Sequence, residues 1–156
     1  SEIEAQGEIS IKSRLTENRG NIFATEKVEV TGEKLDNSNG ELRSNSKIAL
    51  DVKDTRNVKG YILSDGLTKE DVKKEEAKEN SGSISINTEK GINITGTLDN
   101  REGVIRGREI TVGGNLTGNS KGKIDSIGAL TLTGKIIDNK NGIIKGNIKK
   151  INADKL

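Results

Sequence analysis

The sequence predicts an all-β fold: a right-handed parallel β-helix of about seven coils, each roughly twenty residues long, with one short helical insertion. Three observations predict it. An asparagine followed two or three residues later by a glycine recurs at a nearly fixed period. Isoleucine or leucine stands two residues after each of these glycines. The apolar residues are aliphatic and largely β-branched, and the chain has only one Phe and one Tyr, which favours strands over an ordinary core rich in aromatic rings.

The repeat positions form three aligned sets. The asparagines are Asn18, Asn37, Asn57, Asn80, Asn100, Asn119 and Asn139, the glycines are Gly20, Gly40, Gly60, Gly82, Gly103, Gly122 and Gly142, and the apolar residues are Ile22, Leu42, Ile62, Ile84, Ile105, Ile124 and Ile144. In a parallel coil, equivalent residues of successive turns lie about 4.8 Å apart. We therefore expect isoleucine to stack on isoleucine inside, and asparagine amides to form a ladder at a corner. Glycine is expected there because it tolerates positive φ.

Two further apolar segments complete each coil. Pairs with period-two spacing predict short strands with both members on one face, namely Val28/Val30, Ile48/Leu50, Ile92/Ile94, Ile110/Val112 and Leu130/Leu132. A third apolar residue precedes most of the corner asparagines, namely Leu15, Leu35, Leu98, Leu116 and Ile136. An antiparallel meander is the alternative, because Asn39-Gly40 and Asn141-Gly142 are hairpin signals. A meander does not require identical chemistry every twenty residues, so the parallel coil is favoured.

One coil departs from the pattern between residues 67 and 79. This segment lacks glycine and is rich in Glu, Lys and Ala, which favour helix. Thr68 with Asp71 three residues later resembles a capping box. We expect a short helix that replaces the later strands of its coil and leaves the asparagine column intact on either side. Its charged residues, Lys69, Glu70, Lys73, Lys74 and Glu76, are the candidate contacts if the insertion binds a partner.

The composition argues against several classes of function. Without histidine or cysteine, the usual zinc sites and nucleophile–base pairs are excluded. A net charge of +2 with mixed signs is not a nucleic-acid footprint, and no apolar run is long enough to cross a bilayer. No cofactor, no metal, no nucleic-acid partner and no membrane insertion are expected.

Three other site types are weaker alternatives. Acidic residues directly precede several corner asparagines, namely Glu17, Asp36, Glu79, Asp99 and Asp138. Stacked carboxylates could bind calcium, but other residue types interrupt this column, so a solvated corner is favoured over a calcium site. The pairs Thr95/Thr97 and Thr131/Thr133 suggest a flat binding array that the other coils do not sustain. Gly107 and Gly113-Gly114 lack the Lys-Ser/Thr ending of a phosphate loop.

The repeat units resemble the hemagglutinin repeats of filamentous-hemagglutinin-like exoproteins. The likeness is carried by residues 35–42, 98–105 and 137–144, which read LDNSNGEL, LDNREGVI and IDNKNGII. These exoproteins are the large two-partner-secretion adhesins, hemolysins and contact-dependent inhibition proteins of Gram-negative bacteria. The resemblance covers nearly the whole chain apart from 64–79. It implies a secreted or cell-surface β-helical shaft, exported with the help of an outer-membrane transporter partner.

Residues 1–156 are accordingly expected to form one β-helix segment without enzyme activity, an internal fragment whose two ends fall inside a coil and stack on flanking coils of a longer filament. The leading expectation is a structural shaft. The second is a binding module that contacts a host or neighbouring-cell receptor through the 67–79 insertion or an outer strand face. A remote third is a polysaccharide-acting enzyme, because such enzymes occur on β-helices, although fold alone licenses no activity.

Overall fold

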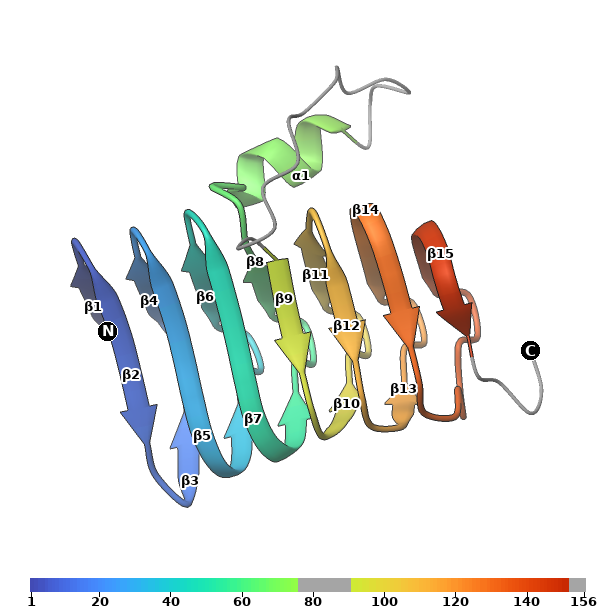
Figure 1. Ribbon diagram of the computed structural model, residues 1–156, viewed down its shortest axis with the longest axis horizontal. Coiled ribbons are helices and arrows are strands. Elements are labelled where there is room, and N and C mark those ends of the chain that lie inside the picture. Colours follow the sequence, from blue (N-terminus) through green and yellow to red (C-terminus); the bar gives the residue numbers. More distant parts are fainter. Residues whose placement is uncertain (76–90, 152–156) are drawn as a thin grey trace.

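The computed structural model describes residues 1–75 and 91–151 and has the predicted parallel β-helix architecture, with a short helix on its outside (Figure 1). The strands and the helix are β1 (Glu2–Ala5), β2 (Glu8–Lys12), β3 (Leu15–Glu17), β4 (Asn21–Ala24), β5 (Lys27–Asp36), β6 (Glu41–Ser44), β7 (Lys47–Arg56), β8 (Tyr61–Leu63), α1 (Lys69–Glu75), β9 (Gly91–Ile94), β10 (Thr97–Asp99), β11 (Val104–Gly107), β12 (Ile110–Val112), β13 (Leu116–Gly118), β14 (Lys123–Leu132) and β15 (Ile143–Ile151). Every strand pair among them is parallel.

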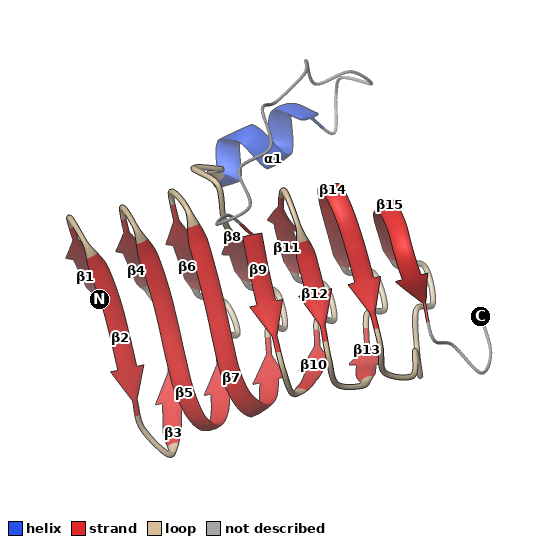
Figure 2. Ribbon diagram, viewed as in Figure 1, coloured by secondary structure: helices blue, strands red, loops and turns tan. Residues whose placement is uncertain are grey.

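The strands form three faces that wind about one axis. The first face contains β1, β4, β6, β8, β11 and the first halves of β14 and β15. The second contains β2, the first halves of β5 and β7, then β9, β12 and the ends of β14 and β15. The third contains β3, the ends of β5 and β7, β10 and β13. Near strands run down and far strands run up while the chain advances to the right, which makes the path right-handed (Figures 1 and 2).

The core is a set of stacked aliphatic columns. On the first face, strand pairing places one aliphatic residue of each layer above the next, namely Ile3, Ile22, Leu42, Ile62, Ile105, Ile124 and Ile144. The sequence repeat predicts this column from Ile22 onward. Leu42, Ile62, Ile105 and Ile124 are completely buried. The second face adds a column that includes Val28, Ile48 and Ile110. Each such side chain removed from water stabilises the fold by about 2 kcal/mol.

The third face differs from prediction in its first coil. Thr16, and not Leu15, pairs with Leu35, so Leu15 is 45% exposed instead of buried. The inward residue stands two positions before the asparagine in this coil, whereas Leu116 stands three before Asn119. The coil that contains Leu116 therefore has one extra residue before its asparagine, and a register shift after Leu98 accommodates it. Sequence spacing alone does not show on which coils the extra residue lies.

The stack has six described corners where seven were predicted. Asn57 bonds directly to Asn100, 43 residues later. On the first face β8 pairs directly with β11, and on the second β7 pairs directly with β9. The predicted corner at Asn80, Gly82 and Ile84 lies outside the described residues. The strands on either side are adjacent, so one coil of double length replaces the two that the periodicity suggested.

The long coil leaves the stack after β8 and forms α1. The helix covers Lys69–Glu75, within the predicted span of 67–79, whose last part lies outside the described residues. The capping box is confirmed: Asp71 N donates to Thr68 Oγ1 at 3.2 Å, and Thr68 N donates to Asp71 Oδ2 at 2.9 Å. Leu63 and Val72 are buried but outside the main core, because Leu63 alternates with inward Ile62 and faces the side on which α1 lies (Figure 1).

The start of this excursion is fixed to the coils on both sides. Asp65 N donates to Ser46 O of the preceding coil at 3.2 Å. Its carboxylate accepts from Arg108 N of the following coil at 2.9 Å, and its side chain is 1% exposed. Asp65 has φ 61°, a left-handed conformation that aspartate tolerates better than most residues. The excursion therefore leaves the stack from an anchored point.

Candidate functional site

The corner asparagines form one continuous hydrogen-bonded ladder along the axis. In each step the Nδ2 of one asparagine donates to the Oδ1 of the next, at 2.7–2.9 Å, through Asn18, Asn37, Asn57, Asn100, Asn119 and Asn139. Four of these side chains are completely buried. Asn100 Nδ2 also donates to Gly103 O and Lys123 O, so each amide links its own turn to the next coil. Buried amides without such partners would be costly, so the ladder ties coil to coil.

The glycine beside each asparagine is explained differently from the prediction. Positive φ occurs at the residue before it, as at Lys59, Glu102 and Lys121, and not at the corner glycine itself. Glycine is needed because a Cβ at Gly122 would lie 2.1 Å from Asn100 O and 2.5 Å from Asn119 Oδ1. Close approach of the preceding coil, and not a left-handed backbone, excludes side chains here.

The acidic residues before the asparagines have a local role. Asp36, Asp99 and Asp138 each accept the backbone N–H two residues later, at 2.9–3.2 Å. This is an Asx turn, which leads the chain into the corner. Burial alone would raise the pKa of Asp36, but hydrogen bonds from Ser38 and Arg19 outweigh it and hold that pKa below its usual value. These contacts explain the three aspartates, whereas Glu17 is exposed and Glu79 lies outside the described residues.

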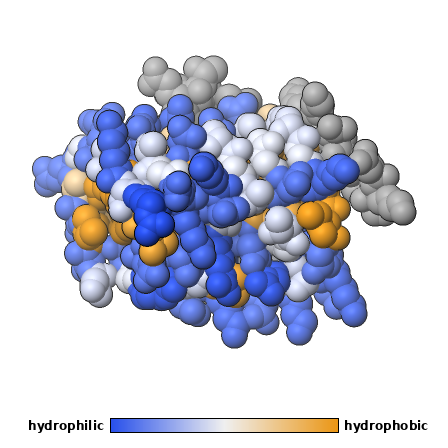
Figure 3. All heavy atoms as spheres, turned by 90° about the horizontal axis from the view of Figure 1, so that it is seen from below, coloured by the Kyte–Doolittle hydropathy of each residue, from blue (hydrophilic) through white to orange (hydrophobic). Residues whose placement is uncertain are grey.

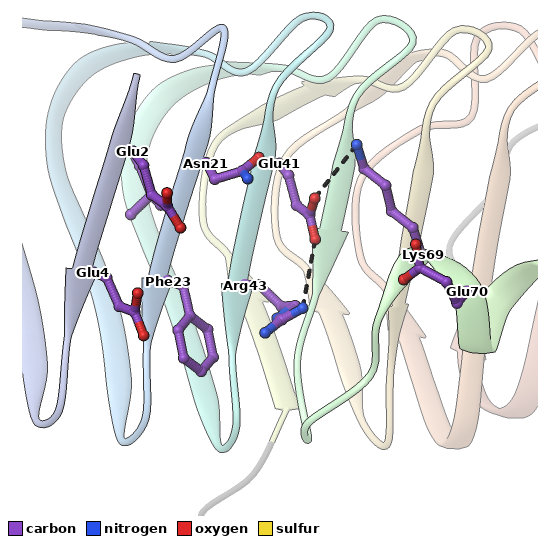
Figure 4. Close-up of a pocket in the computed structure, with 9 residues that line it drawn as sticks. Glu2, Glu4, Asn21, Phe23, Glu41, Arg43, Lys69 and Glu70 are labelled. Atoms are coloured by element: carbon purple, nitrogen blue, oxygen red, sulfur yellow. Dashed lines mark ion pairs between the residues drawn. The ribbon is translucent and has the colours of Figure 1, made fainter.

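A second feature is a hollow on the outer side of the first face, beside the start of α1 (Figure 4). It measures about 280 Å³, and its lining includes Glu2, Glu4, Phe23, Arg43 and Glu70. Strand register explains the arrangement: alternate residues of β1, β4 and β6 point outward, so Glu4, Phe23 and Arg43 stand in one row. The parallel row contains Glu2, Asn21, Glu41 and Tyr61.

Charged and aromatic groups alternate along this hollow. Glu41 lies between two cations: Lys69 Nζ is 3.3 Å from its Oε2, and Arg43 Nη1 is 3.8 Å from its Oε1 (Figure 4). Arg43 lies over the Phe23 ring at 4.4 Å from the centroid, and Lys69 lies over the Tyr61 ring at 5.0 Å. The two aromatic residues of the whole chain thus both support this one surface. Glu41 also fastens α1 to the stack, since Lys69 is the first residue of the helix.

The candidate binding residues of the insertion have different outcomes. Lys69 and Glu70 line the hollow, with Lys69 engaged by Glu41 and Glu70 exposed. Lys73 and Lys74 belong to α1. Glu76 lies outside the described residues. Sequence reasoning missed Phe23, Glu41, Arg43 and Tyr61 as partners of the insertion. The sequence did contain a signal for them. Each of the four is next in sequence to an inward-facing repeat residue, so all four side chains point outward from the first face.

Comparison with known proteins finds no matching family model, no similar curated protein and no similar solved structure. The likeness to hemagglutinin repeats therefore stays a prediction. In the described part of the chain, no group of three or more acidic, histidine or cysteine side chains is arranged to hold a metal ion. No described helix is long and apolar enough to cross a membrane.

Proposed function

We propose that this chain is a structural shaft segment of a large secreted or cell-surface exoprotein, of the adhesin or contact-dependent toxin-delivery kind. The observation that carries the proposal is the unbroken asparagine ladder. It joins every described corner along the axis, even across the 43-residue coil. A chain selected to transmit length and stiffness needs such coupling between layers, whereas a chain selected for chemistry needs reactive groups that converge at one place.

The energetics of the stack also support a shaft. Seven layers on the first face, at about 4.8 Å each, give a rod about 30 Å long whose layers share backbone, amide and aliphatic contacts. Surface charges are mixed and form ion pairs between neighbouring coils, as between Lys59 and Glu102 at 3.6 Å. Such a surface favours solubility over capture of one partner.

A binding module is the second candidate, and the hollow beside α1 favours it. Both aromatic residues of the chain and two cations gather there. A shaft does not require this concentration of aromatic and charged groups. The module would contact a receptor on a host or neighbouring cell through the hollow and the exposed Glu70.

Replacement of the insertion separates the two candidates. Residues 65–90 are exchanged for Asn-Ser, the sequence that joins β6 to β7 in the equivalent turn, and Leu63, which loses its cover, becomes Thr. Ser64 corresponds to Ser44 and Gly91 pairs with Lys47, so two residues suffice for the connection. Fluorescently labelled wild-type and replaced chains are titrated onto bacterial and epithelial cells.

The shaft proposal predicts no saturable binding by either chain. It also predicts a narrow distance distribution of about 30 Å between spin labels on β1 and β15, unchanged by the replacement. Saturable binding by the wild type that the replacement removes would establish the binding module instead. A broad label distance in the folded wild type would contradict the shaft, because a shaft must be stiff.

A further inference from the structure

The excursion that carries α1 leaves and re-enters the stack at a single backbone carbonyl. Asp65 N donates to Ser46 O at 3.2 Å, and Gly91 N donates to the same oxygen at 3.5 Å. Beyond the excursion the strands stack directly on those before it, since β11 pairs with β8 and β9 pairs with β7. The ladder bond from Asn57 to Asn100 crosses the same boundary at 2.8 Å. The two parts of the stack are therefore joined by lateral contacts as well as by the covalent chain.

The helix α1 is fastened to the stack more weakly than any strand is. It is seven residues long, and isolated helices shorter than about 12 residues are marginal in water. In the described part of the chain, its fastening involves Val72, which is 1% exposed, and Lys69, which pairs with Glu41 and lies over the Tyr61 ring. Because α1 lies outside the stack (Figure 1), it can unfold locally without breaking a strand pair.

The last turn of α1 carries two consecutive lysines, Lys73 and Lys74. Adjacent basic residues occur at one other place in the sequence, Lys149-Lys150, which lies in β15 and is paired along β14. Hydrophilic side chains also cover much of the stack (Figure 3), so the exposure of a lysine does not by itself select a site of cleavage. A protease needs a stretch of released backbone, and cleavage therefore occurs where the chain opens locally. Opening α1 releases the first lysine pair, whereas the second requires a strand to leave the sheet.

We propose that α1 is a processing site, at which a protease specific for paired basic residues cuts the peptide bond between Lys74 and Glu75. Water is consumed: its oxygen joins the carbonyl carbon of Lys74 to give a carboxylate, and the nitrogen of Glu75 leaves as an α-ammonium group that takes the protons. The cut divides the chain into residues 1–74 and 75–156, yet the stack stays whole because β7 and β8 still hold β9 and β11. This inference goes beyond the shaft role and does not depend on it, since it follows from how the excursion is attached.

Limited proteolysis of the purified full chain tests the proposal, with a subtilisin-type endoprotease that requires paired basic residues as the probe. Mass spectrometry should find the first cut after Lys74. Denaturing electrophoresis should then show two fragments, while native size-exclusion chromatography shows one particle of unchanged mass with an unchanged β circular dichroism spectrum. Lys73→Gln combined with Lys74→Gln should abolish the cut. Glu33→Lys is the matched control: it completes a basic pair with the exposed Lys34 in β5, which has strands on both sides, and that pair should stay uncut.

The docking of α1 should set the cleavage rate, because the rate follows the population of the open form. Glu41→Gln removes the partner of Lys69 and should speed the cut about threefold. Val72→Ala removes buried apolar surface and should speed it about tenfold. Glu102→Gln removes an ion pair at the asparagine corner and should leave the rate unchanged.

Three results would overturn the proposal. The first is a first cut at any other bond, or no cut under conditions that digest the urea-unfolded chain. The second is separation of the two fragments under native conditions. The third is an equal cleavage rate in the wild type and Val72→Ala, because opening of α1 would then not control the cut.

Discussion

At the scale of single residues, a corner asparagine stabilises the fold through hydrogen bonds to the asparagines of both neighbouring coils. Asn100 accepts from Asn57 and donates to Asn119, both at 2.8 Å, and is completely buried. Asn100→Ala should therefore lower the free energy of unfolding by about 3 kcal/mol. Asn119 Oδ1 loses its buried donor, and Asn57, Gly103 and Lys123 each lose a hydrogen bond to the Asn100 amide. Urea denaturation measures the change. The exposed Asn93→Ala is the matched control and should change stability by less than about 0.5 kcal/mol.

The turn that follows the asparagine holds two neighbouring residues with opposite requirements. Gly122→Ala should destabilise by about 2 kcal/mol or more, because its Cβ would meet Asn100 O at 2.1 Å. Lys121→Gly should stabilise by about 1 kcal/mol, because Lys121 is held at φ 54°. Thermal and urea unfolding of the two variants give the signs. If both changes destabilise equally, the left-handed position has been placed on the wrong residue.

Asp36 makes stability depend on pH in the acidic range. Its pKa is lower in the folded protein than in the unfolded chain, so its ionised form stabilises the fold at neutral pH. That contribution, about 1 kcal/mol, should be fully present above pH 5 and should disappear as pH falls below 3.8 through the folded pKa. Asp36→Asn should therefore lower stability at pH 7 and have almost no effect near pH 2. Asp51→Asn, an exposed aspartate, serves as the control.

At the scale of elements, the insertion is an excursion from the stack and not a layer of it. Exchanging 65–90 for Asn-Ser with Leu63→Thr loses the burial of Leu63 and Val72, about 4 kcal/mol together. The shorter connection recovers about 2 kcal/mol of closure entropy. The replaced chain should therefore keep its β circular dichroism, lose its helical contribution and unfold within a few kcal/mol of the wild type. Loss of the β spectrum would mean that the insertion is part of the core architecture.

The capping box shows how far local sequence predicts an element. Thr68 and Asp71 identified the start of α1 because their hydrogen bonds lie within one turn. The docking of α1 was not predictable in this way. It depends on Glu41 and Tyr61, which reach Lys69 only after strand pairing sets their register. Local signals predict that a helix forms, whereas its place on the surface is decided by tertiary contacts.

At the scale of the whole molecule, periodicity predicted the architecture but gave one corner more than the described residues form. The inward columns follow from Ile22, Leu42 and their equivalents, because stacking requires the same residue type in each coil. The motif at Asn80 matches the repeat in letters, yet the described strands leave no layer for it between Asn57 and Asn100. Likewise Thr16 replaces Leu15 inside because register is set jointly by three faces. A motif shows what a corner needs, but strand pairing decides whether a corner forms.

One measurement tests this architecture most directly. Tyr61 and Val104 are 43 residues apart but face each other on adjacent strands, about 4.8 Å apart. Because the chain has no native cysteine, Tyr61→Cys with Val104→Cys gives a single engineered pair within disulfide range. We expect rapid, complete disulfide formation within one chain, with the β spectrum unchanged and the melting temperature not lowered. Failure of the pair to close in the folded protein would contradict the direct stacking of β8 on β11, and with it the continuous ladder from Asn57 to Asn100.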